Sequence, residues 1–233
     1  MIKNIALIVA LATASVSSQA SSIQYAGYSR ADNSNIVQGF GLQWLSWQST
    51  NHQSIDSALA THTGWRLASN QEMATLFNHF GFGGITWTVS EDEMLLNDGW
   101  TLTEESSYDY FLQLFGVTAS GNNGPCVQSC FYQTDPDLST AALFGSDANG
   151  NGKYNAVAIF SDATYKHPTK GDVRWDQEAR WYGESFERSV AESGRGIALV
   201  RDATASPAQP VNAPATLGLV ALAWVALRLS KKR

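Results

Sequence analysis

The last 23 residues, 211–233, limit what the rest of this chain can be. Eleven uncharged residues run from Leu217 to Leu227, and the final six positions hold four basic residues. Counting back to Ala213 gives fifteen residues, about 22 Å of helix against roughly 30 Å of hydrocarbon core. The span is marginal, although snorkelling by Arg228 would extend it. The basic end favours a cytoplasmic C-terminus and a body outside the membrane.

The N-terminus carries a second export signal. Lys3 precedes an apolar run from Ile5 to Val16, and Ser18-Gln19-Ala20 has the small-x-small pattern that signal peptidase accepts. An N-terminal membrane anchor would need roughly 20 apolar residues. We therefore predict a signal peptide over residues 1–20 that is cleaved after Ala20.

Residues 21–202 are predicted to form a single extracytoplasmic domain, followed by a flexible linker over 203–210. Five of the 15 basic residues lie in the terminal segments, so 10 basic residues face 21 acidic ones and the body has a net charge of −11. A surface of this charge repels phosphate backbones, which excludes nucleic acid as a partner of the body.

The local patterns predict an α+β domain with early helices and late antiparallel strands. A first helix is expected from Ile55 to His62 after Ser54 as N-cap, and a second over 71–80 after Ser69 or Asn70, ended by Gly81. Further expected elements are a helix over 108–115 and strands over 36–47, 65–68, 141–144, 154–161 and 196–201.

The tail resembles the PEP-CTERM sorting signal of Gram-negative bacteria, a V-P-E-P-A-T-L turn followed by a short helix and arginines. Asn212 and Ala213 stand where that pattern has Pro and Glu. The resemblance implies recognition by an exosortase-type membrane transpeptidase and display at the cell surface; the alternative is an ordinary C-terminal membrane helix. The residues that carry the resemblance are Val211, Pro214, Ala215, Thr216, Leu217, Arg228, Lys231, Lys232 and Arg233.

About a third of the body resembles the front half of a C-type-lectin-like domain. Residues 41–77 place a helix before G-W-R-L-A and a capped second helix, and GIALVRD at 196–202 provides a closing strand. The sequence lacks the Trp-Asn-Asp and Glu-Pro-Asn patterns that build the lectin calcium and sugar site. The resemblance therefore supports fold more than sugar binding.

Two loops carry candidate chemistry. Cys126 and Cys130 have three residues between them in a Gly- and Ser-rich loop, where an oxidising compartment favours a disulfide over a zinc or redox motif. Asp147, Asn149 and Asn151 hold positions 1, 3 and 5 of a calcium-loop pattern. Because position 12 is Ala158 and Asn-Gly pairs also form hairpin turns, the sequence favours a plain turn over a calcium site.

No pattern identifies an enzyme. The four histidines are scattered and read as ordinary surface or loop residues, and G-x-S-x-G is absent. The acidic runs at 91–93 and 104–105 are typical of solvated segments. Of the seven tryptophans in the body, Trp175 and Trp181 alternate with charged residues and are the first choices for a ligand-binding surface, although the sequence favours core packing for them.

These observations predict an exported, non-catalytic protein of the cell surface or extracellular matrix, transiently anchored in the inner membrane. Its expected partners are signal peptidase, an exosortase-type enzyme and exopolysaccharide, and no cofactor is expected apart from the calcium alternative. A secreted glycan-acting hydrolase with unidentified carboxylates is the competing hypothesis.

Overall fold

The computed structural model describes residues 21–88, 94–97, 101–102, 107–121, 132–133, 136–147, 150–161, 164–167, 169, 171–174 and 177–203. The chain divides into two units, residues 1–201 and 202–233, and the second is described only at residues 202 and 203. The fold below is that of the first unit, with strand β16 continued to Asp202.

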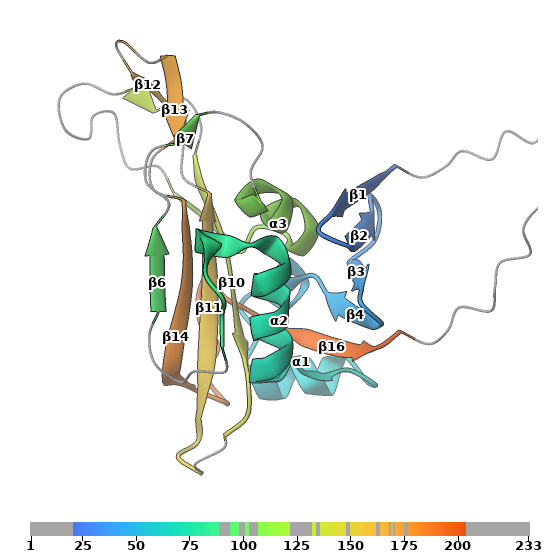
Figure 1. Cartoon of the computed structure of the whole chain (residues 1–233). Coiled ribbons are helices and arrows are strands. Elements are labelled where there is room, and N and C mark those ends of the chain that lie inside the picture. The colour runs from blue at the N-terminus through green and yellow to red at the C-terminus, as the bar shows by residue number, and fades with distance from the viewer. Residues whose placement is uncertain are drawn as a thin grey trace, which may run out of the picture. The chain divides into compact units, whose positions relative to one another are not determined.

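The first sheet gathers strands from both ends of the body in the order β1-β2-β3-β4-β16-β5. Two hairpins supply its first four strands, and β16 lies between β4 and β5 (Figure 1). Its strands are β1 (Ser22–Tyr25), β2 (Tyr28–Ala31), β3 (Ile36–Gly39), β4 (Leu42–Leu45), β5 (Arg66–Leu67) and β16 (Leu199–Asp202).

The second sheet has the order β15-β10-β11-β14-β6, with β8 also paired to β10. Every pair is antiparallel except the short parallel contact between β10 and β15. Its strands are β6 (Met94–Asn97), β8 (Ala119–Gly121), β10 (Asp137–Phe144), β11 (Lys153–Ser161), β14 (Glu178–Glu187) and β15 (Gly196–Ile197).

A smaller antiparallel sheet has the order β7-β13-β12-β9. Its strands are β7 (Thr101–Leu102), β9 (Tyr132–Gln133), β12 (Thr164–His167) and β13 (Gly171–Arg174).

The described residues form three α-helices and two 3-10 turns. The α-helices are α1 (Ile55–Thr61), α2 (Asn70–Phe80) and α3 (Ser107–Phe115), and the 3-10 turns are η1 (Trp47–Thr50) and η2 (Phe82–Gly84). Gly81 ends α2 in the left-handed conformation at φ 69°, as its sequence position predicts.

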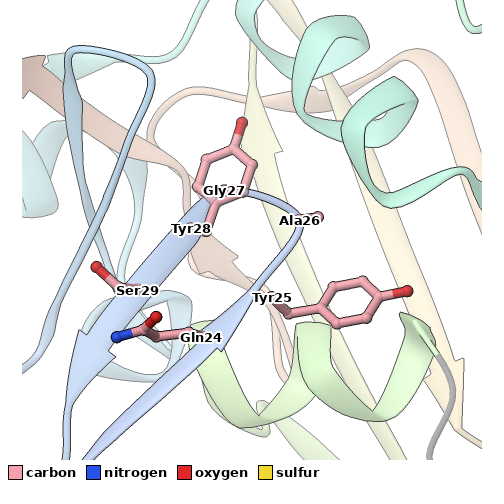
Figure 2. A pocket seen from close by; sticks show the side chains of 6 residues that line it. All are labelled: Gln24, Tyr25, Ala26, Gly27, Tyr28 and Ser29. Carbon is pink, nitrogen blue, oxygen red and sulfur yellow. The ribbon is translucent and has the colours of Figure 1, made fainter.

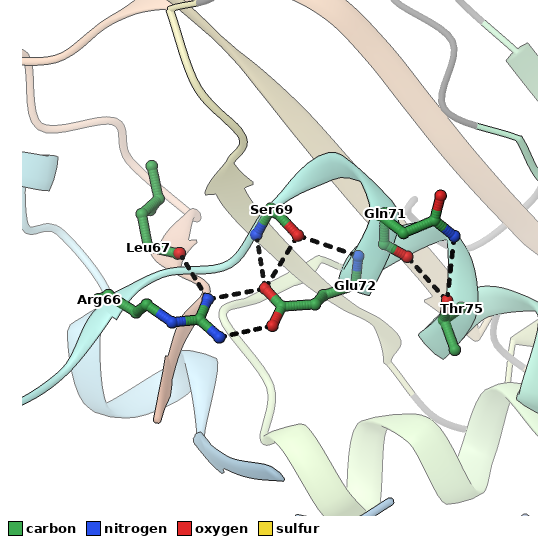
Figure 3. A network of polar contacts seen from close by, with 6 residues as sticks. All are labelled: Arg66, Leu67, Ser69, Gln71, Glu72 and Thr75. Carbon is green, nitrogen blue, oxygen red and sulfur yellow. Dashed lines mark hydrogen bonds and ion pairs between the residues drawn. The ribbon is translucent and has the colours of Figure 1, made fainter. Parts of the chain in front are cut away.

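Each of the first two α-helices begins with a capping box. Ser69 Oγ accepts a hydrogen bond from the Glu72 backbone N–H at 3.2 Å, and the Glu72 carboxylate accepts one from the Ser69 N–H at 2.9 Å. Arg66 on β5 donates two hydrogen bonds to the same carboxylate, at 2.8 and 2.6 Å (Figure 3). Glu72 therefore caps α2 and also ties it to the first sheet.

The second sheet has a hydrophobic cluster on each face. Helices α2 and α3 pack with Phe144, Val157 and Trp181 on one face. On the other face, α1 packs with Leu143 and Ala156. This alternation along β10, β11 and β14 follows from the two-residue period of a strand.

The α+β class and the three helices are confirmed, with Ser54 and Ser69 as the N-caps of α1 and α2. The expected order of early helices and late strands is wrong at the start of the chain, because strands β1 to β4 precede α1. The polar run over 21–35 conceals a hairpin whose outward residues are polar and whose inward residues include Tyr25 and Tyr28.

Candidate functional site

Trp181, a candidate for either a binding surface or core packing, lies in the core. Its side chain is 1% exposed and packs edge-on against Phe144, with 4.6 Å between the ring centroids. Trp181 belongs to the cluster formed with α2 and α3, whereas its neighbour Tyr182 packs on the opposite face of the sheet. Trp181 is therefore not part of an exposed binding surface, and Trp175 lies outside the described residues.

Several other predicted features also lie outside the described residues. They are the signal peptide, Cys126 and Cys130, the acidic runs at 91–93 and 104–105, and the sorting signal over 211–233. All of them stay predictions. Within the described part of the chain, no helix is long and apolar enough to cross a membrane.

The predicted calcium loop lies between β10 and β11. Asn151 Oδ1 accepts a hydrogen bond from the Lys153 backbone N–H at 2.7 Å, and Asn151 Nδ2 donates to Glu184 at 2.8 Å. Asp147 Oδ1 is buried without a hydrogen-bond partner, while Asn149 lies outside the described residues. Calcium needs six or more oxygen ligands, and the described loop has one uncommitted carboxylate oxygen. The geometry fits a hairpin turn better than a cation loop, and calcium stays a prediction.

No described group of three or more His, Cys, Asp or Glu side chains could hold a metal ion. The described ion pairs also occupy many of the charged side chains, as in the pairing of Glu178 with Arg180 at 2.6 Å. The candidate site is instead built from aromatic side chains.

The β3–β4 turn projects one phenylalanine into solvent. Phe40 is 59% exposed, the highest fraction among the large hydrophobic side chains described. Phe40 and Gly41 are the central residues of a two-residue turn and both have positive φ, at 52° and 77°. This pattern belongs to a type I′ turn, which favours Asn, Asp or Gly at both positions.

The β1–β2 turn repeats this departure from the usual turn residues. Ala26 and Gly27 have φ values of 52° and 82°. A left-handed conformation costs a residue with a side chain about 1–2 kcal/mol. At Phe40 the strain fixes an exposed ring in place, which is a property of ligand-binding segments more than of core packing.

The two turns fit together through two glycines. A Cβ added to Gly27 would lie 2.7 Å from Phe40 Cζ, and one added to Gly39 would lie 2.4 Å from Tyr28 Cδ1. Real Cβ atoms do not approach other atoms this closely, because close packing forbids it. Glycine at both positions therefore lets the Phe40 and Tyr28 rings lie flat against the neighbouring hairpin.

Aromatic rings from β1, β2, α2 and α3 lie around Phe40 and extend its aromatic contacts. Phe40 stacks on His79 of α2 with 3.8 Å between centroids, and Tyr25 stacks on Tyr110 of α3 at 4.5 Å. Phe80 is 3% exposed and lies beneath both tyrosines, 5.5 Å from each. We call the set of Tyr25, Tyr28, Phe40, His79 and Tyr110 the aromatic surface.

One hydrogen bond joins two members of this surface, His79 and the buried Tyr28. Tyr28 Oη and His79 Nδ1 lie 3.0 Å apart. Burial raises the pKa of the Tyr28 hydroxyl far above its usual value and lowers the pKa of His79. Tyr28 is therefore protonated and His79 favours its neutral form, so this pair carries little charge.

A hollow of about 380 Å³ adjoins the aromatic surface, lined by residues 24–29. In Figure 2 the Gln24 and Ser29 side chains stand together on the β1–β2 hairpin, while the Tyr25 and Tyr28 rings extend away from them. The volume is within the range of about 300–1,000 Å³ for small-molecule sites. The hollow is thus lined by amide and hydroxyl groups from one side of the hairpin and by aromatic residues from the other, and a ligand that reaches both needs C–H and hydroxyl faces.

Sequence reasoning missed this site, and His79 was interpreted as an ordinary surface residue. Its five members come from β1, β2, the β3–β4 turn, α2 and α3, so no short motif contains them. The available signals were the Ala-Gly and Phe-Gly pairs that close the two hairpins. A Phe at a turn position that normally holds Asn, Asp or Gly was the specific signal for this site.

No family model, curated protein or solved structure matches this chain. Its function must therefore be inferred from its own residues.

Proposed function

We propose that this chain is an exported, non-catalytic protein of a Gram-negative cell surface or extracellular matrix, and that it binds exopolysaccharide through the aromatic surface. Signal peptidase removes residues 1–20, and the tail over 211–233 holds the body at the inner membrane until an exosortase-type enzyme processes it. The observation that carries the binding function is Phe40, a ring 59% exposed and held at positive φ.

The ligand class follows from chemistry. A sugar ring presents C–H groups that pack on an aromatic face and hydroxyls that bond to amides and hydroxyls at its edge. Phe40 stacked on His79 supplies such a face. Its ring also packs on Gly27, and Gly27 lines the hollow to which Gln24 and Ser29 contribute polar groups. The body's net charge of −11 disfavours polyanions, so we expect a neutral polysaccharide.

The likeness to C-type-lectin-like domains is part of this proposal at the level of fold. The order α1, β5, α2 matches the expected helix, G-W-R-L-A segment and capped second helix. The closing strand β16 pairs with β5, where Leu199 opposes Leu67 and Val200 opposes Arg66. The aromatic surface differs from the calcium-dependent sugar site of lectins, so the proposed binding mode does not need that site.

The test replaces the exposed ring. We expect Phe40→Ala to weaken binding of the exported body, residues 21–210, to neutral glycans on an array by roughly tenfold or more, equivalent to ~1.4 kcal/mol. Val190→Ala is the matched control, because Val190 is also an exposed apolar side chain, at 40%, and lies outside the aromatic surface. Equal binding by both variants would contradict the proposal.

A glycosidase screen on the same preparation tests the competing hydrolase hypothesis. We expect binding without turnover. Turnover that a single Glu or Asp substitution abolishes would favour the hydrolase and overturn the non-catalytic assignment.

A further inference from the structure

The second sheet has a separate hollow, on a different part of the body from the aromatic surface. Its volume is about 350 Å³, and it is lined by residues of β8, β10 and β11. These residues are Ala119, Ser120, Gly121, Asp137, Leu138, Ser139 and Phe160. The volume suits a small-molecule site.

Strand register places an aromatic ring at one wall of this hollow. Phe160 on β11 opposes Ser139 on β10, which in turn opposes Ala119 on β8. From the other side, Arg180 on β14 lies over the Phe160 ring at 5.0 Å from its centroid. Arg180 covers the side toward β14, so the side of Phe160 toward β10 and β8 is the one that meets the hollow.

The rest of the lining combines small and polar residues. Ala119 and Gly121 leave space above the edge strand. Asp137 and Ser139 provide a carboxylate and a hydroxyl on the Phe160 side, whereas Ser120 opposes Leu138 and lies on the other side. Arg180 forms an ion pair with Glu178, which offsets its charge. An aromatic wall with hydroxyl and carboxylate groups at its edge suits a neutral sugar unit, whose hydroxyls can donate to the carboxylate.

The Phe160 side of the hollow and the aromatic surface lie on opposite faces of the second sheet. Ser161 donates a hydrogen bond to Asp109 of α3 at 2.6 Å, so Ser161 faces α3 and the adjacent Phe160 faces the other way. Helix α3 also carries Tyr110, a member of the aromatic surface. One sugar chain packed on the rings at α3 therefore cannot fill the hollow by a short continuation.

We propose that the hollow at Phe160 is a second site for a neutral sugar unit and that the body is bivalent. The inference of a sugar as ligand rests on the proposed function. Two sites on opposite faces let one molecule bind two polysaccharide strands and join them, because each strand reaches a different side of the sheet.

Calorimetric titration of the body with cellohexaose, laminarihexaose and mannohexaose tests this proposal. We expect two binding events per molecule for the natural sequence with at least one of these probes, and one event for Gly121→Trp, which fills the hollow. Gly121 opposes Asp137 and so lies on the Phe160 side of the strands, and a Cβ added there would meet nothing within 4 Å, so the indole is tolerated. Asp137→Asn, which preserves shape, should weaken one event severalfold. Ser189→Trp, at an exposed turn outside both sites, should retain two events.

The outcomes separate this inference from the proposed function. A single event that Phe40→Ala abolishes and Gly121→Trp leaves unchanged would overturn the second site and keep the first. Two events in the Gly121→Trp variant would also overturn it. Absence of binding to every probe would contradict the proposed function and the inference together. Cross-linking of the matching long polysaccharide, measured as turbidity, should require both sites.

Discussion

Gly27 and Gly39 determine how closely the two hairpins of the first sheet can approach each other. Both positions are filled by an aromatic ring of the other hairpin, Phe40 over Gly27 and Tyr28 over Gly39. Gly27 also has φ at 82°, where residues with a Cβ are strained. The exposed ring at Phe40 thus depends on a residue that has no side chain at all.

Replacing Gly27 by Ala should therefore have two effects. We expect a loss of about 1–2 kcal/mol in unfolding free energy from the positive φ, and weaker glycan binding because the new methyl displaces Phe40. Gly64→Ala is the matched control, since Gly64 has φ at 83° and an added Cβ would meet nothing within 4 Å. Denaturant unfolding should show a loss in both variants, whereas only Gly27→Ala should lose binding. Unchanged binding in Gly27→Ala would contradict this account of the turn.

At the scale of elements, the best-specified parts of the body are the helix starts. Ser54 and Ser69 cap α1 and α2 with reciprocal hydrogen bonds, and Arg66 extends the second cap into the neighbouring sheet. Burial alone would raise the pKa of Glu72, but hydrogen bonds from Arg66 and Ser69 outweigh it and lower the pKa below its ordinary value. The ionised carboxylate of Glu72 is therefore the form that accepts these hydrogen bonds and stabilises the fold.

This cap should make the stability depend on acid. Because the folded pKa of Glu72 lies below that of the unfolded chain, its contribution is present above about pH 4.5 and is lost as the pH falls through the folded value. Glu72→Gln should destabilise the body by ~1 kcal/mol at neutral pH and reduce the loss on acidification. Gln71→Ala, at an exposed position on the same helix, is the control in urea unfolding at several pH values. The same acid sensitivity in Glu72→Gln would contradict this role.

The elements differ in how well the sequence predicts them. Helices α1, α2 and α3 were predictable because caps, apolar spacing and Gly81 are local signals. Strand β14 shows the opposite case. Its alternation was visible around Trp181, but the sequence does not say which of two adjacent residues faces the core when one is a tryptophan and the other a tyrosine. The aromatic surface depends on how five elements come together, β1, β2, the β3–β4 turn, α2 and α3, and no local pattern contains them all.

For the whole molecule, the proposed export and surface display depend on the two terminal segments. The body has a net charge of −11, and the basic residues of the tail are absent from it. Removal of both terminal segments would release an acidic domain that stays soluble through its own repulsion. Retention of the tail would instead hold it at the membrane.

Mass measurement of the mature protein from its host distinguishes these states. We expect an N-terminus at Ser21 and a C-terminus near Asn212 or Pro214. Deletion of residues 211–233 should shift the protein from the cell surface to the periplasm or medium. Cell fractionation and immunoblotting would measure this shift. An intact Arg233 in the mature protein would contradict sorting by cleavage and favour a permanent anchor.

The place of β16 in the first sheet has a consequence for the order of assembly. A chain exported from its N-terminus presents β1 to β5 early, yet the strand that separates β4 from β5 comes from residues 199–202. Until residues 199–202 are in place, β5 lacks the strand it pairs with, and the first sheet ends at β4. Completion of the body must therefore wait for nearly its last residue, and such distant pairing is slow. Under the proposed export, the domain closes only after almost all of it has left the translocation channel, so the end of export would time its maturation.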